Sequence, residues 1–427
     1  MRIWLATVGE PLPGDSENVR LLRTGQFAQW LADRGHDVTF FTGTMDHYGR
    51  RLRHAQTHIE MQQENYRIVQ LAGRLYRKTI SVSRFMNHLD VAREFDRVAP
   101  QLERPDIILA SFPTIELCEA VARYSKSHSV PFVVDVRDFW PDIFVELLPG
   151  PLRVLGPIAF GGLERRTKTV LGSANGLSGV AQSALDWALR KAGRDQHQFD
   201  FWHSFTYPRT QGGVQSAMPD PHAVEAREGF VKFCFFGTHS HRVNLEMFVR
   251  SFLELERRGV PASIMLCGKG AATEKLMSLA AGSRSVLFPG WLNTQQIRHI
   301  MSISDVGILP YNSPDFHLSI PNKVAEYLSG GLPVLSCTEG EVRSLLEREA
   351  CGFWCAPNER AIVDAVTRLS QDRSAIDAAA ARAKNVFARM FEADAVFEGV
   401  MKRFEAIVEA PPQQRTDYVN VAQRIAH

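Results

Sequence analysis

The stretch SIPNKVAEYLSGGLPVLSC, residues 319–337, predicts a short helix followed by a buried parallel strand. A proline and a polar cap open the helix, and two glycines end it. The first turn of a helix carries free N–H groups and a positive dipole end, which together suit a phosphate. Lys323 adds a charge beside that position, and the Glu326 carboxylate one turn later can accept hydrogen bonds from a sugar diol. A capped amphipathic helix with solvated side chains explains the isolated pattern equally well.

Length and composition favour a globular protein of two domains. The chain has 427 residues, of which 45% are hydrophobic and 22% are charged. A net charge of only +2 does not indicate a protein that binds nucleic acids in general. Most of the six cysteines lie in or beside apolar runs, which is typical of reduced, buried thiols and favours a cytoplasmic protein. No pair of cysteines has a partner pair at metal-site spacing, so no metal is expected.

The chain start, MRIWLATVGEP, has a short apolar run without a small-residue cleavage site, so we expect no signal peptide. No stretch approaches the ~18 consecutive apolar residues of a transmembrane helix.

The N-terminal half has the order of a doubly wound α/β sheet. Strands are predicted at 2–8, 36–42, 105–113 and 131–136, with helices at 21–35 and 116–127. A loop containing Gly14 follows the first strand, at the sheet edge where such folds bind ligands, but it lacks the dinucleotide fingerprint. Arg137, Asp138 and Trp140 follow another strand at that edge, which favours ligand contact over core packing.

Two basic segments in this half leave alternatives open. Residues 44–100 are rich in His, Arg and Tyr and could face an anionic substrate, an acidic membrane surface or only solvent. His54 and His58 share helical spacing but have no apparent third metal ligand. Residues 151–171 predict a basic amphipathic helix that either packs on its own domain or meets a membrane or a partner.

A second α/β series predicts another Rossmann-like domain. Its strands are expected at 231–236, 263–267, 285–288, 305–309 and 333–337, followed by a C-terminal helix over 387–410. The predicted parts are an N-terminal domain over 1–205, a linker over 206–228, a second domain over 229–395, and a C-terminal helix with a mobile tail over 396–427. Two such domains make the cleft between them the default ligand site.

Several loops converge on the carboxyl edge of the second predicted sheet. GTHSHR, residues 237–242, offers a glycine for close backbone approach and His239 and Arg242 as donors to an anion. CGKG, residues 267–270, follows the next strand, and PGWLN, residues 289–293, could border a nucleobase. Together with the helix at 322, these loops predict a nucleotide site.

The chain resembles the GT-B glycosyltransferases, specifically the large retaining family-4 group that uses nucleotide-activated sugars. The resemblance covers nearly the whole chain and rests on RGHDVTFFT, DVRDFWPD, FFGTHS, FPGWL and, most specifically, PNKVAEYLSGGLPVLS. It implies that Glu326 holds the ribose hydroxyls, that the helix start from Ile320 to Lys323 holds the diphosphate, and that the Gly14 loop reaches the phosphates across the cleft. It also implies a C-terminal helix that crosses back to the first domain.

Some positions depart from the family pattern. Leu318 replaces a glutamate that often touches the donor sugar, and Arg137 stands before Asp138 where many members carry a histidine. The usual Arg and Lys pair after the FFG-type strand is reduced to His239, His241 and Arg242. The predicted catalytic residues are Lys323, Arg242, His239, Asp138 and Arg137. The predicted donor-binding residues are Gly14, Gly237, Thr238, Lys269, Trp291, Leu292, Ser319, Ile320, Asn322 and Glu326.

The expected reaction moves a glycosyl group from a nucleotide-diphosphate sugar to an acceptor hydroxyl, with retention and without metal or cofactor. The resemblance implies that the departing phosphate accepts the acceptor's proton, and uridine is the commonest base in the resembling group. Two alternatives remain, a nucleotide-sugar epimerase and a non-catalytic subunit with the same fold. The acceptor is open: a lipid-linked polysaccharide precursor, a protein or a small molecule fits the basic N-terminal region, with peripheral membrane contact as one interpretation.

Overall fold

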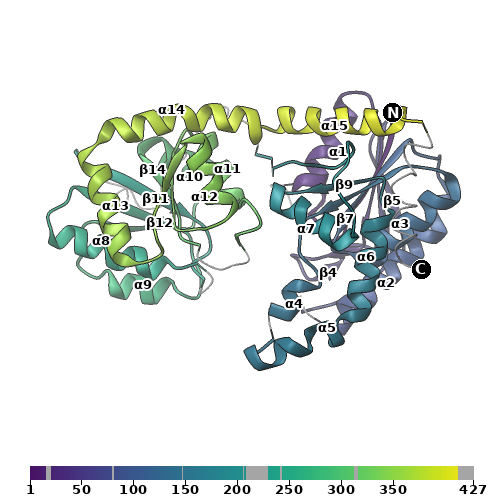
Figure 1. Ribbon diagram of the computed structural model, residues 1–427, viewed down its shortest axis with the longest axis horizontal. Helices are drawn as coiled ribbons and strands as arrows, with labels where there is room; N and C mark the ends of the chain where they lie inside the picture. Colours follow the sequence, from purple (N-terminus) through teal and green to yellow (C-terminus); the bar gives the residue numbers. More distant parts are fainter. Residues whose placement is uncertain are drawn as a thin grey trace. The chain divides into compact units, whose positions relative to one another are not determined.

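The computed structural model describes residues 1–15, 21–78, 81–146, 148–204, 206–207, 229–240, 243–311 and 316–411. The chain forms two compact units: unit 1 comprises Met1–His203 and Phe397–His427, and unit 2 comprises Ser204–Val396 (Figure 1). Of the predicted linker over 206–228, only Thr206 and Tyr207 lie within the described residues.

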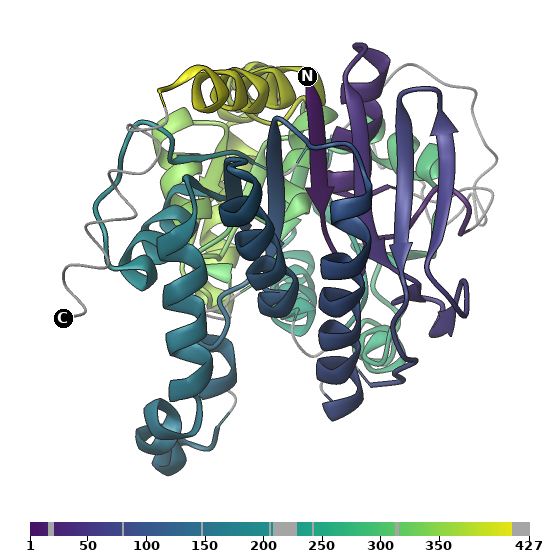
Figure 2. The same ribbon diagram turned by 90° about the vertical axis from the view of Figure 1, so that its right-hand side faces the viewer.

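Unit 1 is built on a sheet with the strand order β10-β9-β8-β7-β1-β2-β6-β5. Its strands are β1 Arg2–Ala6, β2 Asp37–Gly43, β5 His58–Gln63, β6 Tyr66–Leu71, β7 Ile107–Phe112, β8 Phe132–Val136, β9 Gly176–Gly179 and β10 Phe201–Trp202. Neighbouring strands are parallel except for β5 and β6, which form an antiparallel hairpin at the sheet edge (Figure 2). The parallel strands are buried on both faces and therefore read as continuous apolar runs such as IILASF.

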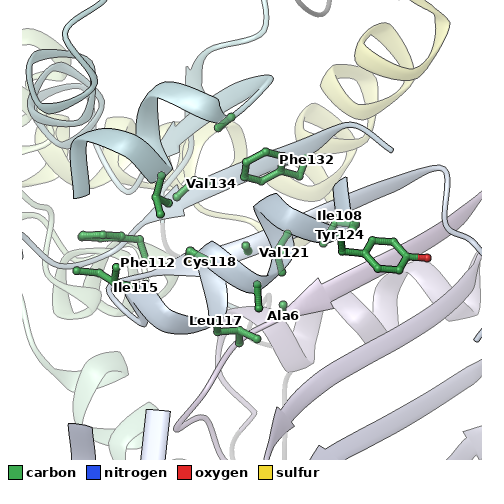
Figure 3. Close-up of a cluster of buried hydrophobic side chains, with 14 of the residues drawn as sticks. Ala6, Ile108, Phe112, Ile115, Leu117, Cys118, Val121, Tyr124, Phe132 and Val134 are labelled. Atoms are coloured by element: carbon green, nitrogen blue, oxygen red, sulfur yellow. The ribbon is translucent and has the colours of Figure 1, made fainter. Parts of the chain in front are cut away.

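Helices cover this sheet. They are α1 Arg23–Asp33, α2 Val82–Val98, α3 Ile115–His128, α6 Gly161–Ser173 and α7 Gln182–Ala192. Figure 3 shows the core between α3 and its neighbouring strands, where Leu117 lies beside Ala6, and Cys118 and Val121 lie between them and Val134. Such burial contributes about 1.5–3 kcal/mol for each large apolar side chain. This core holds the strand ends, and the loops that follow them, in fixed positions.

Unit 2 confirms the second Rossmann-like series. Its parallel sheet has the order β13-β12-β11-β14-β15-β16. The strands are β11 Val231–Phe236, β12 Ala262–Cys267, β13 Val286–Gly290, β14 Val306–Leu309, β15 Val334–Ser336 and β16 Gly352–Trp354. The helices are α8 Leu245–Arg257, α9 Thr273–Leu279, α10 Thr294–Ile303, α11 Asn322–Ser329, α12 Glu341–Glu349, α13 Glu359–Gln371 and α14 Arg373–Met390.

Several local predictions were wrong. The segment 151–171 is not one helix but a 3-10 turn, Gly150–Leu155, followed by α5 Gly156–Ala159 and α6, because prolines and glycines interrupt it. His58 begins strand β5, so it does not share a helix with His54, although their rings stack with centroids 4.0 Å apart. The strands β5, β6 and β16 were not predicted.

The predicted C-terminal helix is two helices. The first, α14, ends at Met390, and α15 Ala393–Glu409 follows and belongs mainly to unit 1, where Phe397 packs on Phe27 with ring centroids 4.9 Å apart. At the break, Tyr207 and Glu392 form an isolated β-bridge within unit 2. Its hydrogen bond runs from the Tyr207 N–H to the Phe391 carbonyl at 3.0 Å. None of the described helices is both long enough and apolar enough to cross a membrane.

Candidate active site

Helix α11 brings Lys323 and Glu326 together at the carboxyl edge of the unit 2 sheet. Three residues apart on the helix, they form an ion pair in which Nζ lies 2.5 Å from Oε2. Glu326 is buried, whereas Lys323 keeps 23% of its side-chain surface exposed. Pro321 occupies the N-cap position, and its side chain cannot accept a hydrogen bond from the first turn, so the polar cap expected from the sequence is absent there. The first N–H groups of α11 therefore have no cap from that residue.

Tyr207 completes the surroundings of Glu326. Its hydroxyl donates to Oε1 of Glu326 at 3.2 Å, so each carboxylate oxygen has its own partner. Tyr207 falls in the segment that the sequence assigns to a linker, and no motif marks it. Because Tyr207 and Glu326 are far apart in the sequence, no local sequence pattern could reveal their contact.

Tyr327 fixes α11 against the sheet. Its ring lies across Gly307 of β14, where an added Cβ would come within 2.5 Å of the ring. The Tyr327 hydroxyl donates to the Cys234 carbonyl at 3.4 Å and accepts from the Phe236 N–H at 3.4 Å. Burial raises the pKa of Tyr327 well above its usual value, so the phenol stays neutral. These contacts hold the start of α11 beside the end of β11.

Glycines let three strand ends approach one another beside Lys323. An added Cβ on Gly237 would lie 3.8 Å from Cε of Lys323. An added Cβ on Gly268 would lie 1.8 Å from the Gly237 carbonyl oxygen, which shows how closely the two loops pack. The Gly268 N–H donates to the Gly290 carbonyl at 2.8 Å, which joins the loop after β13 to the same edge. The loops after β11, β12 and β13 and the start of α11 therefore meet, as the sequence predicts.

His239 joins two of these chain segments by hydrogen bonds. Its Nδ1 lies 3.1 Å from Oγ1 of Thr273, its N–H donates to the Lys269 carbonyl, and its carbonyl accepts from the Ala272 N–H. The imidazole is completely buried, and burial lowers its pKa. A buried imidazole with a lowered pKa differs from the cation expected from the sequence; its hydrogen bonds join the loops, and a catalytic role for His239 stays a prediction.

The other predicted donor residues divide by exposure. Thr238, Lys269, Trp291 and Asn322 have exposed side chains, and that of Ser319 is half-buried. Leu292 and Ile320 point into the core of unit 2, so only their backbone groups can meet a ligand. His241 and Arg242 lie outside the described residues.

In unit 1 the predicted catalytic residue Arg137 is held by the protein itself. Its Nε donates to Oδ2 of Asp135 at 2.8 Å, Nη2 donates to Oγ1 of Thr24 at 2.9 Å, and Nη1 pairs with Glu10. Only 15% of the side chain is exposed. The Glu10 carboxylate also accepts from the N–H groups of Thr24 and Gly25 and thereby caps the start of α1. These contacts assign Arg137 a structural role in this edge.

Asp135 is the centre of this buried network. Its Oδ1 accepts from Nη2 of Arg23 at 2.9 Å and from the Ser178 hydroxyl at 2.6 Å. Burial opposes its ionisation, but Arg23 and Arg137 outweigh that effect and hold its pKa well below the usual value. Sequence analysis missed Asp135, although a carboxylate inside the buried run FVVDV is itself a signal.

Gly14 and Asp138 lie at the same edge of unit 1. Gly14 is the exposed tip of a turn in which the Asp15 carboxylate accepts from the Leu12 N–H at 2.8 Å. Arg53 fixes that turn through two contacts with Asp15, each 2.6 Å long. Asp138 has an exposed side chain, unlike Arg137 before it. Gly14 and Asp138 are thus accessible to a ligand of unit 1.

Within the described residues, the unit 2 edge offers backbone N–H groups, the ammonium groups of Lys323 and Lys269 and the carboxylate of Glu326 around a glycine-lined surface. Such a set can bind a diphosphate and a diol. Among the described residues, no group of three or more His, Cys, Asp and Glu side chains lies close enough to hold a metal ion.

Two family models match the chain. Residues 22–199 match the family model described as a glycosyl transferase 4-like domain. Residues 231–372 match the model described as glycosyl transferases group 1. A sequence search of curated proteins finds no match.

Solved structures share the fold across nearly their whole length. Sucrose-phosphate synthase from Thermosynechococcus elongatus has a TM-score of 0.69 at 13% identity, covering 96% of this chain and 100% of its own. HepE from Anabaena, solved in complex with UDP, has a TM-score of 0.64 at 12% identity, covering 95% and 100%. WaaG, a glycosyltransferase involved in lipopolysaccharide biosynthesis, has a TM-score of 0.55 at 13% identity, covering 96% and 100%.

Proposed function

We propose that this chain, which belongs to the family-4-like glycosyltransferases with the GT-B fold, transfers a glycosyl group from a nucleotide-diphosphate sugar to an acceptor hydroxyl with retention of configuration. The observation that carries the proposal is the Lys323–Glu326 pair at the start of α11, beside the glycines of three strand ends. It unites a cation and N–H groups for a diphosphate with a carboxylate for ribose hydroxyls.

In this mechanism the bond between the anomeric carbon and the diphosphate oxygen breaks, and negative charge grows on the departing diphosphate. Lys323 and the first N–H groups of α11 stabilise that charge, which is usually the largest catalytic contribution. The acceptor oxygen forms its bond to the anomeric carbon on the face that the diphosphate leaves. The departing phosphate takes the acceptor's proton, so no protein base is needed in unit 2.

Donor binding rearranges the ion pair. The phosphates attract Lys323, and the ribose hydroxyls donate to Glu326, whose other oxygen keeps the Tyr207 hydroxyl as partner. Uridine is the proposed base, because HepE was solved with UDP and with UDP-glucose. Trp291 is the residue proposed to border that base, which its 65% exposure and its position directly after Gly290 support.

The proposed acceptor is a polysaccharide, glycolipid or other glycoconjugate precursor bound by unit 1. Asp138 is placed to accept a hydrogen bond from an acceptor hydroxyl, because it is exposed at the carboxyl edge of the sheet. Peripheral membrane contact is proposed for the segment that projects from unit 1 around α4, Asp142–Glu146, and α5 (Figure 1). There Leu152, Val154 and Ile158 are exposed, and Arg153 lies among them.

The test is Lys323→Ala. Its turnover should fall by about ten- to a thousandfold, since one charge-stabilising donor is lost. The stabilisation of the protein by UDP, measured as the rise in melting temperature, should shrink as well.

Lys275→Ala is the matched control, because that lysine is 67% exposed on the same unit and pairs with Glu246. It should keep both wild-type turnover and UDP stabilisation. A folded Lys323→Ala protein with full turnover would contradict the assignment. Incubating the donor without acceptor distinguishes glycosyl transfer from the epimerase alternative. Only an epimerase would convert the donor sugar to its epimer under those conditions.

A further inference from the structure

A group of aromatic and basic side chains gathers at the carboxyl edge of the unit 1 sheet, apart from the network around Asp135. We call it the Arg84 cluster, and it consists of His47, Tyr76, Arg84, His88 and Trp140. His47 follows β2, Tyr76 follows β6 and Trp140 follows β8, while Arg84 lies in the first turn of α2. The loops after parallel strands form the ligand-binding edge of such sheets, so these residues share a surface suited to binding.

Arg84 lies near two aromatic rings. Its guanidinium carbon is 5.7 Å from the centroid of the Trp140 ring and 6.0 Å from that of Tyr76. Its own backbone N–H donates to the Ser81 hydroxyl at 3.2 Å, which fixes the first turn of α2. Arg84 and Trp140 are both half-buried. A guanidinium that lies near two aromatic rings and is only partly covered is suited to bind a planar or tetrahedral anion.

The remaining members of the cluster are fixed by their own contacts. Nδ1 of His47 lies 2.8 Å from the Tyr76 hydroxyl. The His88 ring stacks on Trp140 with centroids 6.4 Å apart, and its Nδ1 lies 3.6 Å from Oε2 of Glu116. The shape of the cluster is therefore set before any ligand arrives.

Two carboxylates around this cluster are engaged by other cations, and a third, Asp138, lies close enough to Arg84 for the charge of the guanidinium to act on it. Asp46 pairs with Arg51 at 3.3 Å and with Arg53 at 3.9 Å, and Glu116 pairs with Arg166 at 2.8 Å. Burial lowers the pKa of His47, and the cations Arg84 and Arg50 lower it further, which indicates a locally positive potential. Arg50, Arg77 and Lys78 add exposed charge of the same sign.

We propose that the Arg84 cluster binds an anionic group, a phosphate or a carboxylate, carried by the acceptor. This rests on the proposed glycosyl transfer and names the acceptor class. Arg84 donates two hydrogen bonds to the anion, and the Trp140 ring offers an apolar face to the adjacent sugar or linker. The reaction that supplies this acceptor must then leave a phosphoryl or carboxylate group on its product.

The experiment measures binding, with UDP saturating so that anions do not enter the donor site. α-Glucose 1-phosphate and methyl α-glucoside are titrated by calorimetry against wild type, Arg84→Gln and Arg93→Gln. Arg93 lies on the same helix, is 72% exposed and contacts Asp90 at 3.9 Å, so its variant is the matched control. A parallel arm uses phosphatidylcholine vesicles with and without phosphatidylglycerol.

We expect wild type and Arg93→Gln to bind the phosphate-bearing probe more tightly than the neutral one. Arg84→Gln should weaken that binding by about ten- to a hundredfold, since a hydrogen bond to a charged group is lost. Arg84→Lys should recover only part of the affinity, because an ammonium lacks the planar pair of N–H donors with which a guanidinium binds an anion. Arg84-dependent binding of glucose 1-phosphate assigns a soluble acceptor, and Arg84-dependent binding of anionic vesicles assigns a lipid headgroup.

The proposal is overturned if wild type and Arg84→Gln bind the anionic probes equally in both arms. It is also overturned if wild type binds glucose 1-phosphate no better than methyl α-glucoside and anionic vesicles no better than neutral ones. An unfolded Arg84→Gln protein is recognised by its melting curve, and Arg84→Lys then decides. Loss of UDP binding in Lys323→Ala concerns the donor site alone, so the two proposals fail independently.

Discussion

The two sheets carry their charges at the carboxyl edge in different ways. In unit 1, Arg23 and Arg137 are held by Asp135 and Glu10, so buried cations and carboxylates neutralise one another within the protein. In unit 2 the edge is lined by glycines, of which Gly268 and Gly270 leave no room for a Cβ, and the side chain of Lys323 is partly exposed beside them. The first arrangement holds the sheet edge in shape, whereas the second has a single, partly exposed ion pair beside glycines that leave the backbone open to a ligand. Charge density alone therefore does not locate a donor site.

Removing the central carboxylate tests the unit 1 half of this comparison and should have the largest effect. Asp135→Ala leaves Arg23 and Arg137 buried without their shared partner, which should cost about 3–5 kcal/mol of unfolding free energy. Urea unfolding of the full chain, followed by a probe in unit 1, measures the change. Asp96→Ala is the matched control, since its ion pair with Arg123 is exposed and contributes about 0–1 kcal/mol. Equal effects of the two variants would contradict the structural role of the network.

Filling the space between loops tests the unit 2 half. Gly268→Ala places a Cβ 1.8 Å from the Gly237 carbonyl at a φ of +140°, so the loops must separate. We expect a loss of stability above the about 1–2 kcal/mol that a left-handed conformation costs, and at least tenfold weaker UDP binding. Gly282→Ala has a φ of +81° but no atom within 4 Å of the new Cβ. It should therefore show backbone strain without loss of UDP binding, and a similar loss in both variants would show that crowding is not the cause.

A smaller effect is expected from pH. The pKa of His239 is lowered in the folded protein because its imidazole is buried, whereas an unfolded histidine titrates near about 6.5. Below that pH the unfolded chain binds a proton that the folded chain refuses, so this contribution to stability is lost as the pH falls.

His239→Gln should make the decline of the melting temperature from pH 7 to pH 5 shallower. Part of the decline should persist, because burial also lowers the pKa values of His36, His47 and His197. His58→Gln, at an exposed position, should keep the wild-type slope. An unchanged slope in His239→Gln would mean that this imidazole is not buried in solution.

The fold could be predicted from sequence because the core strands of both units are apolar runs between turn residues, as in VKFCFF and ASIMLC. The hairpin β5–β6 was missed because β5 is largely exposed and carries the polar sequence HIEMQQ, which lacks a buried face. The break between α14 and α15 was missed because its cause is a bridge to Tyr207, distant in the sequence.

The candidate site was predictable where residues share one helix, as Lys323 and Glu326 do. The surroundings of Arg137 and His239 were not predictable, because charge and exposure depend on neighbours from other elements, and the catalytic roles expected of these two residues stay predictions. Arg137 meets Glu10 from 127 positions away, and no local pattern contains that contact.

Under the proposed function, the ion pair between Lys323 and Glu326 would also select which anions the site accepts. Inorganic phosphate must compete with the Glu326 carboxylate for the ammonium and gives that carboxylate nothing in return. A nucleotide would satisfy both side chains, since its phosphates would bind Lys323 while its ribose hydroxyls would replace Lys323 as the partner of Glu326. In a cell where free phosphate is abundant, this preference would keep the empty protein available for the proposed donor.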